Sequence, residues 1–279
     1  MFTSNPFADL VNVIPQSAMK TYIFLMIILV AGGTIIDMIH KQSAKFFFAN
    51  AEKAKLNAKR EVSGGEKVSL AVSTLTNEVL TSGEFSNPKR RISHLFTMYG
   101  FIIFVITTVL QIWASPLAAD ATPVATLWWH IGAAMLCFGG YWFWFFIRVD
   151  VSAEGRPWYK LVRADMFILS LLATATFALL WSFNRGGSMA GLLFVLFILS
   201  STILFGGVLW SKFAHMFFKP AAAFQKKITK ADGSRENLPA TYDLSDPKVQ
   251  ALFPDIPEYM GKNPENMGLG IKRESPNHY

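Results

Sequence analysis

Five long apolar runs constrain what this chain can fold into more than any other feature of its sequence. A helix of about 20 predominantly apolar residues crosses the hydrocarbon core of a bilayer, and a helix satisfies its backbone amides within its own segment, as lipid requires. We therefore predict an all-α fold, a polytopic membrane protein whose five transmembrane helices form a bundle. The predicted helices occupy residues 22–39, 95–117, 126–147, 165–183 and 189–210.

The composition also points to lipid. The residues are 52% hydrophobic and 16% charged, whereas about a quarter of a soluble domain is charged. The single cysteine, Cys137, lies within an apolar run, which excludes an internal disulfide and a four-thiolate zinc or iron–sulfur site. The net charge of +7 would suit nucleic acid only as a basic face on a soluble fold. Because the basic residues instead flank apolar runs, we expect no nucleic-acid partner.

The basic residues predict an orientation. Cytoplasmic segments of membrane proteins collect Lys and Arg. If the N-terminal segment 1–21 lies outside, every Lys and Arg except Lys20 and Arg185 falls on the cytoplasmic side. We therefore predict a multi-pass membrane protein with its C-terminus in the cytoplasm. The segments predicted to be cytoplasmic are 40–93, 148–164 and the chain from 211 onward.

Three features outside the apolar runs carry further predictions. Residues 43–60 read as an amphipathic helix on the inner membrane surface, with an ordinary solvated helix as the alternative. The fifth helix is expected to continue to about residue 219, because Pro220 marks a stop. The proline-rich tail 220–279 is too poor in apolar residues for a core, so we expect an extended docking arm for a soluble partner or a tail without a role. Glycines in the third and fifth helices are interpreted as close-packing positions between helices.

Two of the five histidines suggest a haem. With one cysteine, a bundle that carries electrons would use a b-type haem between two imidazoles from different helices at the same depth. His94 and His215 lie at the predicted inner ends of the second and fifth helices and are our candidate axial ligands of the haem iron. The alternative is two interfacial histidines with snorkelling basic neighbours. The cations that would pair with the haem propionates are Arg90, Arg91 and Lys212.

The other histidines have different settings. His40 and Asp37 lie one turn apart at the inner end of the first helix, where they could relay protons or bind a quinone carbonyl, or simply occupy the headgroup region. His40 could also replace either haem ligand. His130 follows two tryptophans at the predicted outer end of the third helix, as part of an aromatic belt or as the lip of a polar path with Gln111 and Arg185.

No pattern for nucleophilic catalysis or phosphate binding is found. The glycine pairs at 64–65 and 206–207 lack a Walker or dinucleotide motif. We therefore expect no catalytic residues apart from a quinone-reactive site.

Five helices with histidines at the inner ends of the second and fifth resemble the gamma-subunit family of respiratory nitrate reductase. In that family two haems each bridge these two helices. His94 and His215 match the pair nearer the cytoplasm, whereas the positions of the other pair, near Phe104 and Phe197, are not histidine. The resemblance therefore implies one haem b.

Longer strings resemble the membrane anchors associated with dissimilatory adenylylsulfate reductase of sulfur-oxidising bacteria. This resemblance implies a subunit of a bacterial inner membrane that passes electrons between a cytoplasmic reductase and the quinone pool. The reductase has soluble alpha and beta subunits and converts sulfite and AMP to adenylylsulfate. A haem-free anchor of the same reductase and a small transporter are the alternatives. The strings are 5–8 (Asn-Pro-Phe-Ala), 37–41 (Asp-Met-Ile-His-Lys), 80–85 (Leu-Thr-Ser-Gly-Glu-Phe), 139–150, 212–225 and the terminal His278-Tyr279.

Overall fold

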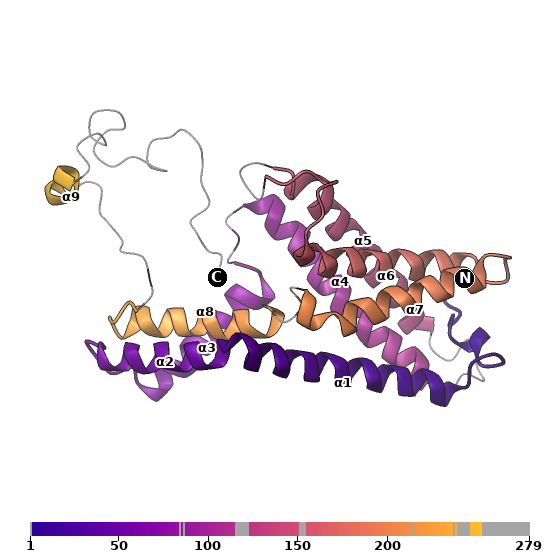
Figure 1. The fold of residues 1–279 in the computed structure, drawn as a ribbon, viewed down its shortest axis with the longest axis horizontal. Helices are drawn as coiled ribbons and strands as arrows, with labels where there is room; N and C mark the ends of the chain where they lie inside the picture. The colour runs from indigo at the N-terminus through magenta and orange to yellow at the C-terminus, as the bar shows by residue number, and fades with distance from the viewer. Residues whose placement is uncertain are drawn as a thin grey trace. The chain divides into compact units, whose positions relative to one another are not determined.

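The fold is all-α within the part of the chain that the structure describes, as predicted. The computed structural model describes residues 2–83, 85, 87–114, 123–150, 155–211, 213, 215–236, 238 and 246–252 (Figure 1). The chain divides into two compact units. Unit 1 comprises Met1–Lys45 and Pro88–Lys219, and unit 2 comprises Phe46–Asn87 and Pro220–Tyr279.

Unit 1 holds the apolar helices. Four of its helical segments are long and apolar enough to cross a membrane, namely α1, α4, α5 with the π-helical segment η3 that follows it, and α6 with the short turn η4 before it. The apolar helix α7 has 17 residues, about 25 Å at 1.5 Å per residue, which is at the lower limit for a span. A multi-pass membrane protein is therefore supported. The bounds are η1 Ala8–Leu10, α1 Gln16–Lys41, α4 Pro88–Trp113, α5 Pro123–Trp142, η3 Phe143–Ile147, η4 Arg163–Asp165, α6 Met166–Phe183, α7 Ala190–Gly206, η5 Val208–Trp210 and the beginning of α8 (His215–Ala231).

Successive long helices of unit 1 run in opposite directions. The hydroxyl of Thr126 at the start of α5 donates to the side chain of Gln111 near the end of α4, and Ser93 near the start of α4 donates to the carbonyl of Gly139 at 2.8 Å. We call the end that holds residues 4–16, 111–114, 123–130 and 182–190 the His130 end. The opposite end, with the first turns of α4 and the last turn of α1, is the His94 end.

Glycines let α4 and α5 approach closely. A Cβ on Gly132 of α5 would lie 2.8 Å from the backbone nitrogen of Phe104, and a Cβ on Gly100 of α4 would lie 2.7 Å from that of Leu136. Contacts this short exclude any side chain at these two positions. The close-packing prediction is thus confirmed for the third helix. It is wrong for Gly191 in the fifth, where an added Cβ would meet nothing within 4 Å.

Two helix boundaries differ from the sequence predictions. Helix α4 begins at Pro88, because proline suits the first turn of a helix, so His94 lies in its second turn. The fifth apolar helix ends at Gly206 instead of reaching residue 219. The poor helix propensity of the pair Gly206-Gly207 accounts for this end. Helix α8 then begins anew and contains Pro220 in its interior.

Unit 2 folds part of the tail together with the 46–87 segment. Helix α2 (Ser43–Leu56) is shorter than the predicted amphipathic helix, and the glycine pair at 64–65 opens α3 (Gly64–Ser73), which continues as the π-helical segment Thr74–Leu80. The Ser63 hydroxyl caps α3 by accepting a hydrogen bond from the Glu66 amide at 3.2 Å. Residues 220–231 are helical and α9 covers Pro247–Leu252, unlike the extended tail that the sequence predicts.

Polar contacts join these segments of unit 2. Lys227 on α8 donates to Ser73 at 3.1 Å and pairs with Glu78, and Lys53 pairs with Glu236 at 3.1 Å. Hydrogen bonding to Lys53, and then to Asn57, lowers the pKa of Glu236. A carboxylate with a lowered pKa stabilises the fold above its unfolded pKa and loses this effect as the pH falls through the folded value. Acid should therefore weaken the contacts that Glu236 makes with Lys53 and Asn57.

Candidate functional site

The structure describes only part of the predicted haem site. His94 is half-buried in the second turn of α4, with half-buried Arg90 and Arg91 in the turn before it. His215 is the first residue of α8 and not part of α7. Lys212, the side chain of His215, and His278 lie outside the described residues. Haem ligation by His94 and His215 therefore stays a prediction.

A second haem does not fit where the nitrate reductase resemblance would place it. The rings of Phe104 and Phe197 contact each other, with their centroids 6.4 Å apart. Trp129 stacks on Phe104 at 5.3 Å, and Trp181 stacks on Phe197 at 5.9 Å. The space between α4 and α7 at this level is therefore filled by side chains. We call this packed group the aromatic cluster; it consists of Phe7, Phe104, Trp129, Trp181, Phe194 and Phe197.

A pocket with both polar and apolar walls lies at the His94 end, where α1, η4 and η5 meet. Its volume is about 570 Å³, within the range of small-molecule sites. Gly33 of α1 allows η5 to come close, since a Cβ there would lie 3.0 Å from the Cβ of Val208. We call it the Asp37 pocket; its lining residues are Ile36, Asp37, His40, Lys41, Arg163, Ala164, Leu209, Trp210 and Ser211.

The Asp37 pocket combines a buried acid with exposed bases. Asp37 is 4% exposed, and its carboxylate pairs with Lys41 at 2.6 Å. A carboxylate so deeply buried needs such a partner. His40 and Arg163 are exposed on the pocket wall, while Trp210 and Leu209 provide apolar surface. The predicted pair Asp37 and His40 therefore shares one pocket with Arg163 and Trp210, which the sequence reasoning did not single out.

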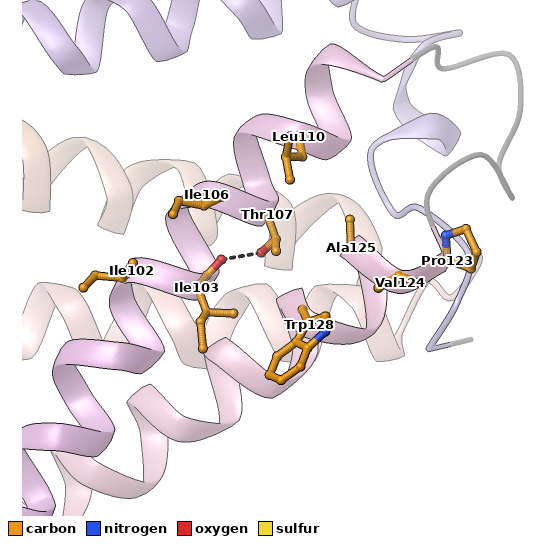
Figure 2. Close-up of a pocket in the computed structure, with 9 residues that line it drawn as sticks. All are labelled: Ile102, Ile103, Ile106, Thr107, Leu110, Pro123, Val124, Ala125 and Trp128. Carbon is orange, nitrogen blue, oxygen red and sulfur yellow. Dashed lines mark hydrogen bonds between the residues drawn. The ribbon is translucent and has the colours of Figure 1, made fainter.

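A second hollow, between α4 and α5, is almost entirely apolar. It has a volume of about 700 Å³ and is lined by isoleucines of α4 and by Trp128 of α5 (Figure 2). Its one hydroxyl, that of Thr107, donates to the Ile103 carbonyl at 2.6 Å and is thus already engaged. The groove suits a hydrocarbon chain, because the described residues that line it are apolar apart from Thr107 and the indole nitrogen of Trp128.

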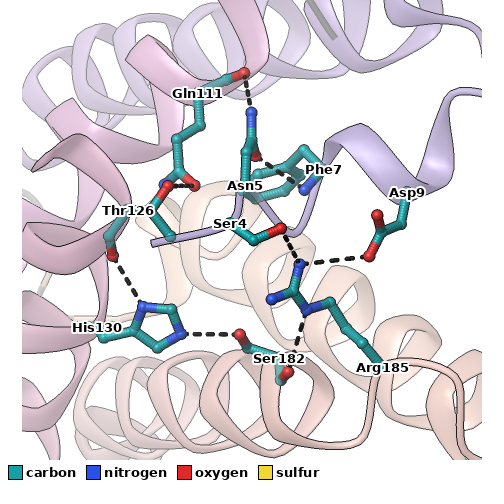
Figure 3. Close-up of polar contacts among 9 residues, drawn as sticks. All are labelled: Ser4, Asn5, Phe7, Asp9, Gln111, Thr126, His130, Ser182 and Arg185. Carbon is teal, nitrogen blue, oxygen red and sulfur yellow. Dashed lines mark hydrogen bonds and ion pairs between the residues drawn. The ribbon is translucent and has the colours of Figure 1, made fainter. Parts of the chain in front are cut away.

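A buried polar network lies at the His130 end (Figure 3). The His130 Nδ1 is 2.8 Å from the Thr126 carbonyl and its Nε2 is 2.8 Å from the Ser182 hydroxyl. Since a carbonyl only accepts, Nδ1 carries the proton and Nε2 accepts from Ser182. Gln111 joins through Thr126, and Arg185 joins through the Ser182 carbonyl. The structure thus brings together His130, Gln111 and Arg185, the residues of the predicted polar path.

The N-terminal segment closes this end of the bundle. The Asn5 amide donates to the Gln111 carbonyl at 2.9 Å, and the Gln16 amide donates to the Ile112 carbonyl at 2.8 Å. These bonds satisfy carbonyls that the C-terminus of α4 would otherwise leave unpaired. Asp9 pairs with Arg185 at 3.3 Å, and Phe7 packs against Trp181. The signals of this role in the sequence were an apolar residue and side-chain amides in a segment expected to lie outside the membrane.

No protein-family model, curated protein or solved structure matches this chain. The chain is therefore assigned to no family.

One further charged pair, missed from the sequence, organises the His94 end. Arg148, which follows η3, is fully buried and pairs with Asp165 at the start of α6. It also donates to the carbonyls of Pro157 at 2.7 Å and Lys160 at 2.8 Å, and it lies 4.3 Å from the ring centre of Trp144. The signal available in the sequence was a pair of opposite charges, at residues 148 and 165, at the facing ends of two consecutive apolar runs.

Proposed function

We propose that this chain is an electron-transfer subunit of a bacterial inner membrane that links a cytoplasmic adenylylsulfate reductase to the quinone pool. The observation that carries the proposal is the Asp37 pocket, because it combines proton-carrying and cationic side chains with an apolar wall. The strings that resemble adenylylsulfate reductase anchors supply the identity of the partner and of the substrates, sulfite and AMP.

The side chains of the Asp37 pocket suit quinone reduction. Reduction of a quinone to a quinol consumes two electrons and two protons. Lys41 and Arg163 can donate hydrogen bonds to the quinone oxygens, and Trp210 offers a flat apolar surface for the ring. His40 is exposed, and an imidazole can pass protons from the adjacent aqueous phase to a bound quinone.

The proposal includes one haem b held by His94 and His215. The haem would supply one-electron steps between the reductase and the quinone. Arg90 and Arg91, half-buried one turn from His94, would pair with its propionates. A haem bound there would lie at the same end of the bundle as the Asp37 pocket.

The proposed orientation places the His94 end in the cytoplasm. In the described part of unit 1, the Lys and Arg residues of the His130 end are Lys20 and Arg185, and the others lie toward the His94 end. This asymmetry is the pattern of the positive-inside rule. The alpha and beta subunits of the reductase would dock on this face, with the tail beyond residue 252, which is outside the described residues, as a docking arm.

Purification in mild detergent tests the proposal directly. We expect co-purification of the reductase and a reduced-minus-oxidised spectrum of a low-spin b haem. His94→Ala should abolish that spectrum, whereas His130→Ala should leave it. A normal haem spectrum in His94→Ala would refute the ligand assignment and make His40 the first candidate. Bound reductase without any haem would establish the haem-free anchor, and absence of both would favour a transporter.

A substitution in the Asp37 pocket tests the quinone site. His40→Gln should lower quinone reduction driven by sulfite and AMP by about 10²-fold, the lower range for loss of an acid–base group. The rate is measured with the reductase complex in proteoliposomes. Asp9→Asn, an exposed carboxylate at the His130 end, is the matched control and should leave the rate unchanged. An unaltered rate in His40→Gln would place the quinone elsewhere.

A further inference from the structure

The residues that precede α6 have a backbone held in place by a buried arginine. We call residues 155–163 the Trp158 loop. The guanidinium of Arg148 is 0% exposed and donates to two carbonyls of this loop, those of Pro157 and Lys160. Planar, multiply bonded arginine holds such an arrangement more rigidly than lysine could. The loop therefore presents its side chains in a fixed geometry.

The side chains that the Trp158 loop presents are aromatic and basic. Trp158 is 55% exposed and Tyr159 is 69% exposed, and the side chains of Arg156 and Lys160 are exposed beside them. Tryptophan and tyrosine with basic neighbours are typical of the membrane–water interface.

A continuous row of rings connects this loop to the surface of α5. Tyr141 stacks with Phe145 at 6.1 Å, Phe145 contacts Trp158 at 6.3 Å, and Trp158 contacts Tyr159 at 5.7 Å. Tyr141 and Phe145 belong to the candidate span Pro123–Ile147 and are exposed on its outer surface. The row therefore begins on the exposed surface of a candidate span and continues onto the loop.

From this continuity we propose that the Trp158 loop is a rigid interfacial anchor that binds anionic phospholipid headgroups at the His94 end. The rings of Trp158 and Tyr159 lie among the headgroups, and Arg156 and Lys160 bind their phosphates. Arg148 is a positioning residue that holds the loop at this depth. A protein partner would not require the row of rings to start within the span, which favours lipid as the occupant.

Membrane depth at Tyr159 tests the proposal, and the single cysteine makes the experiment simple. In a Cys137→Ser background, Tyr159→Cys carries a spin label in nanodiscs that contain phosphatidylglycerol. Ile28→Cys, on an exposed face of α1, is the hydrocarbon reference, and free label in buffer is the aqueous reference. We expect accessibility to oxygen and to a water-soluble nickel complex to place Tyr159 between the two references.

Two results would overturn the proposal. One is a spin label at residue 159 that is as accessible to the nickel complex as free label in buffer. The other is a label that becomes protected only when the soluble reductase is added, which would make the loop a protein-docking site.

The charge requirement is tested separately with the full chain in detergent. The Arg156→Gln/Lys160→Gln double variant should bind phosphatidylglycerol more weakly by about fivefold per removed charge, the equivalent of about 1 kcal/mol each. Lys20→Gln, at the His130 end, is the control and should retain wild-type affinity. Equal affinity in the double variant and the wild type would contradict phosphate binding by this loop.

Discussion

Replacing Gly132 with leucine should prevent α4 and α5 from assembling. A Cβ at this position would already lie 2.8 Å from the Phe104 nitrogen and 3.0 Å from the Gly100 carbonyl oxygen. Both neighbours are backbone atoms, so no rotamer change relieves the contact, and the helices must separate. We expect a loss of more than about 3 kcal/mol, the upper range for overpacked cores. The measurement is the yield of monodisperse protein in size-exclusion chromatography after detergent extraction.

Gly191→Leu provides the matched control. It changes the same residue type within an apolar helix, but an added Cβ there would meet nothing within 4 Å. Its yield should equal that of the wild type. If the two variants behaved alike, the close approach of α4 and α5 would be refuted.

Arg148→Met should cost about 3–5 kcal/mol of stability, since it leaves a buried charge without its partner. Asp165 is 8% exposed. Of the contacts described for its carboxylate, it would keep only the hydrogen bond from the Val162 amide, at 2.9 Å. The carbonyls of Pro157 and Lys160 would lose their donor as well. Unfolding by dodecyl sulfate titration, followed by circular dichroism, measures the loss.

A double-mutant cycle separates the ion pair from the carbonyl contacts. Arg148→Met/Asp165→Leu removes both charges, so it should be less destabilised than the sum of the two single variants. It should still fall short of the wild type, because the two loop carbonyls remain unpaired. Strict additivity of the two losses would show that the pair contributes no coupling energy.

The apolar runs predicted the helices well because lipid leaves a spanning segment few alternatives. Helix ends were harder to predict, since they depend on local residues that hydropathy does not weigh. Pro88 starts α4 before its apolar run, Gly206 ends α7 within a run, and Ser63 with Glu66 opens α3 at a glycine pair that resembles a break.

The candidate site could be predicted only in part. Asp37 and His40 were found because they are one turn apart on a single helix, and local spacing reports such pairs. Arg163 and Trp210 come to the same pocket from segments distant in sequence, and only the packing of α1 against η5 brings them there. The insertion of Asn5 and Phe7 into the bundle likewise depends on tertiary contacts that no periodicity encodes.

The aromatic cluster has a consequence for how energy could be conserved. Its rings include the buried Phe7, Phe104, Trp129, Trp181 and Phe197; they fill space between α4 and α7, and Trp129 contacts His130. Packed rings carry no protons themselves, because they offer neither titratable groups nor room for a chain of water molecules. Under the proposed function, electrons and protons would thus reach the quinone from the same side. Turnover would generate no membrane potential by itself, and the energy would be recovered only when other respiratory enzymes reoxidise the quinol.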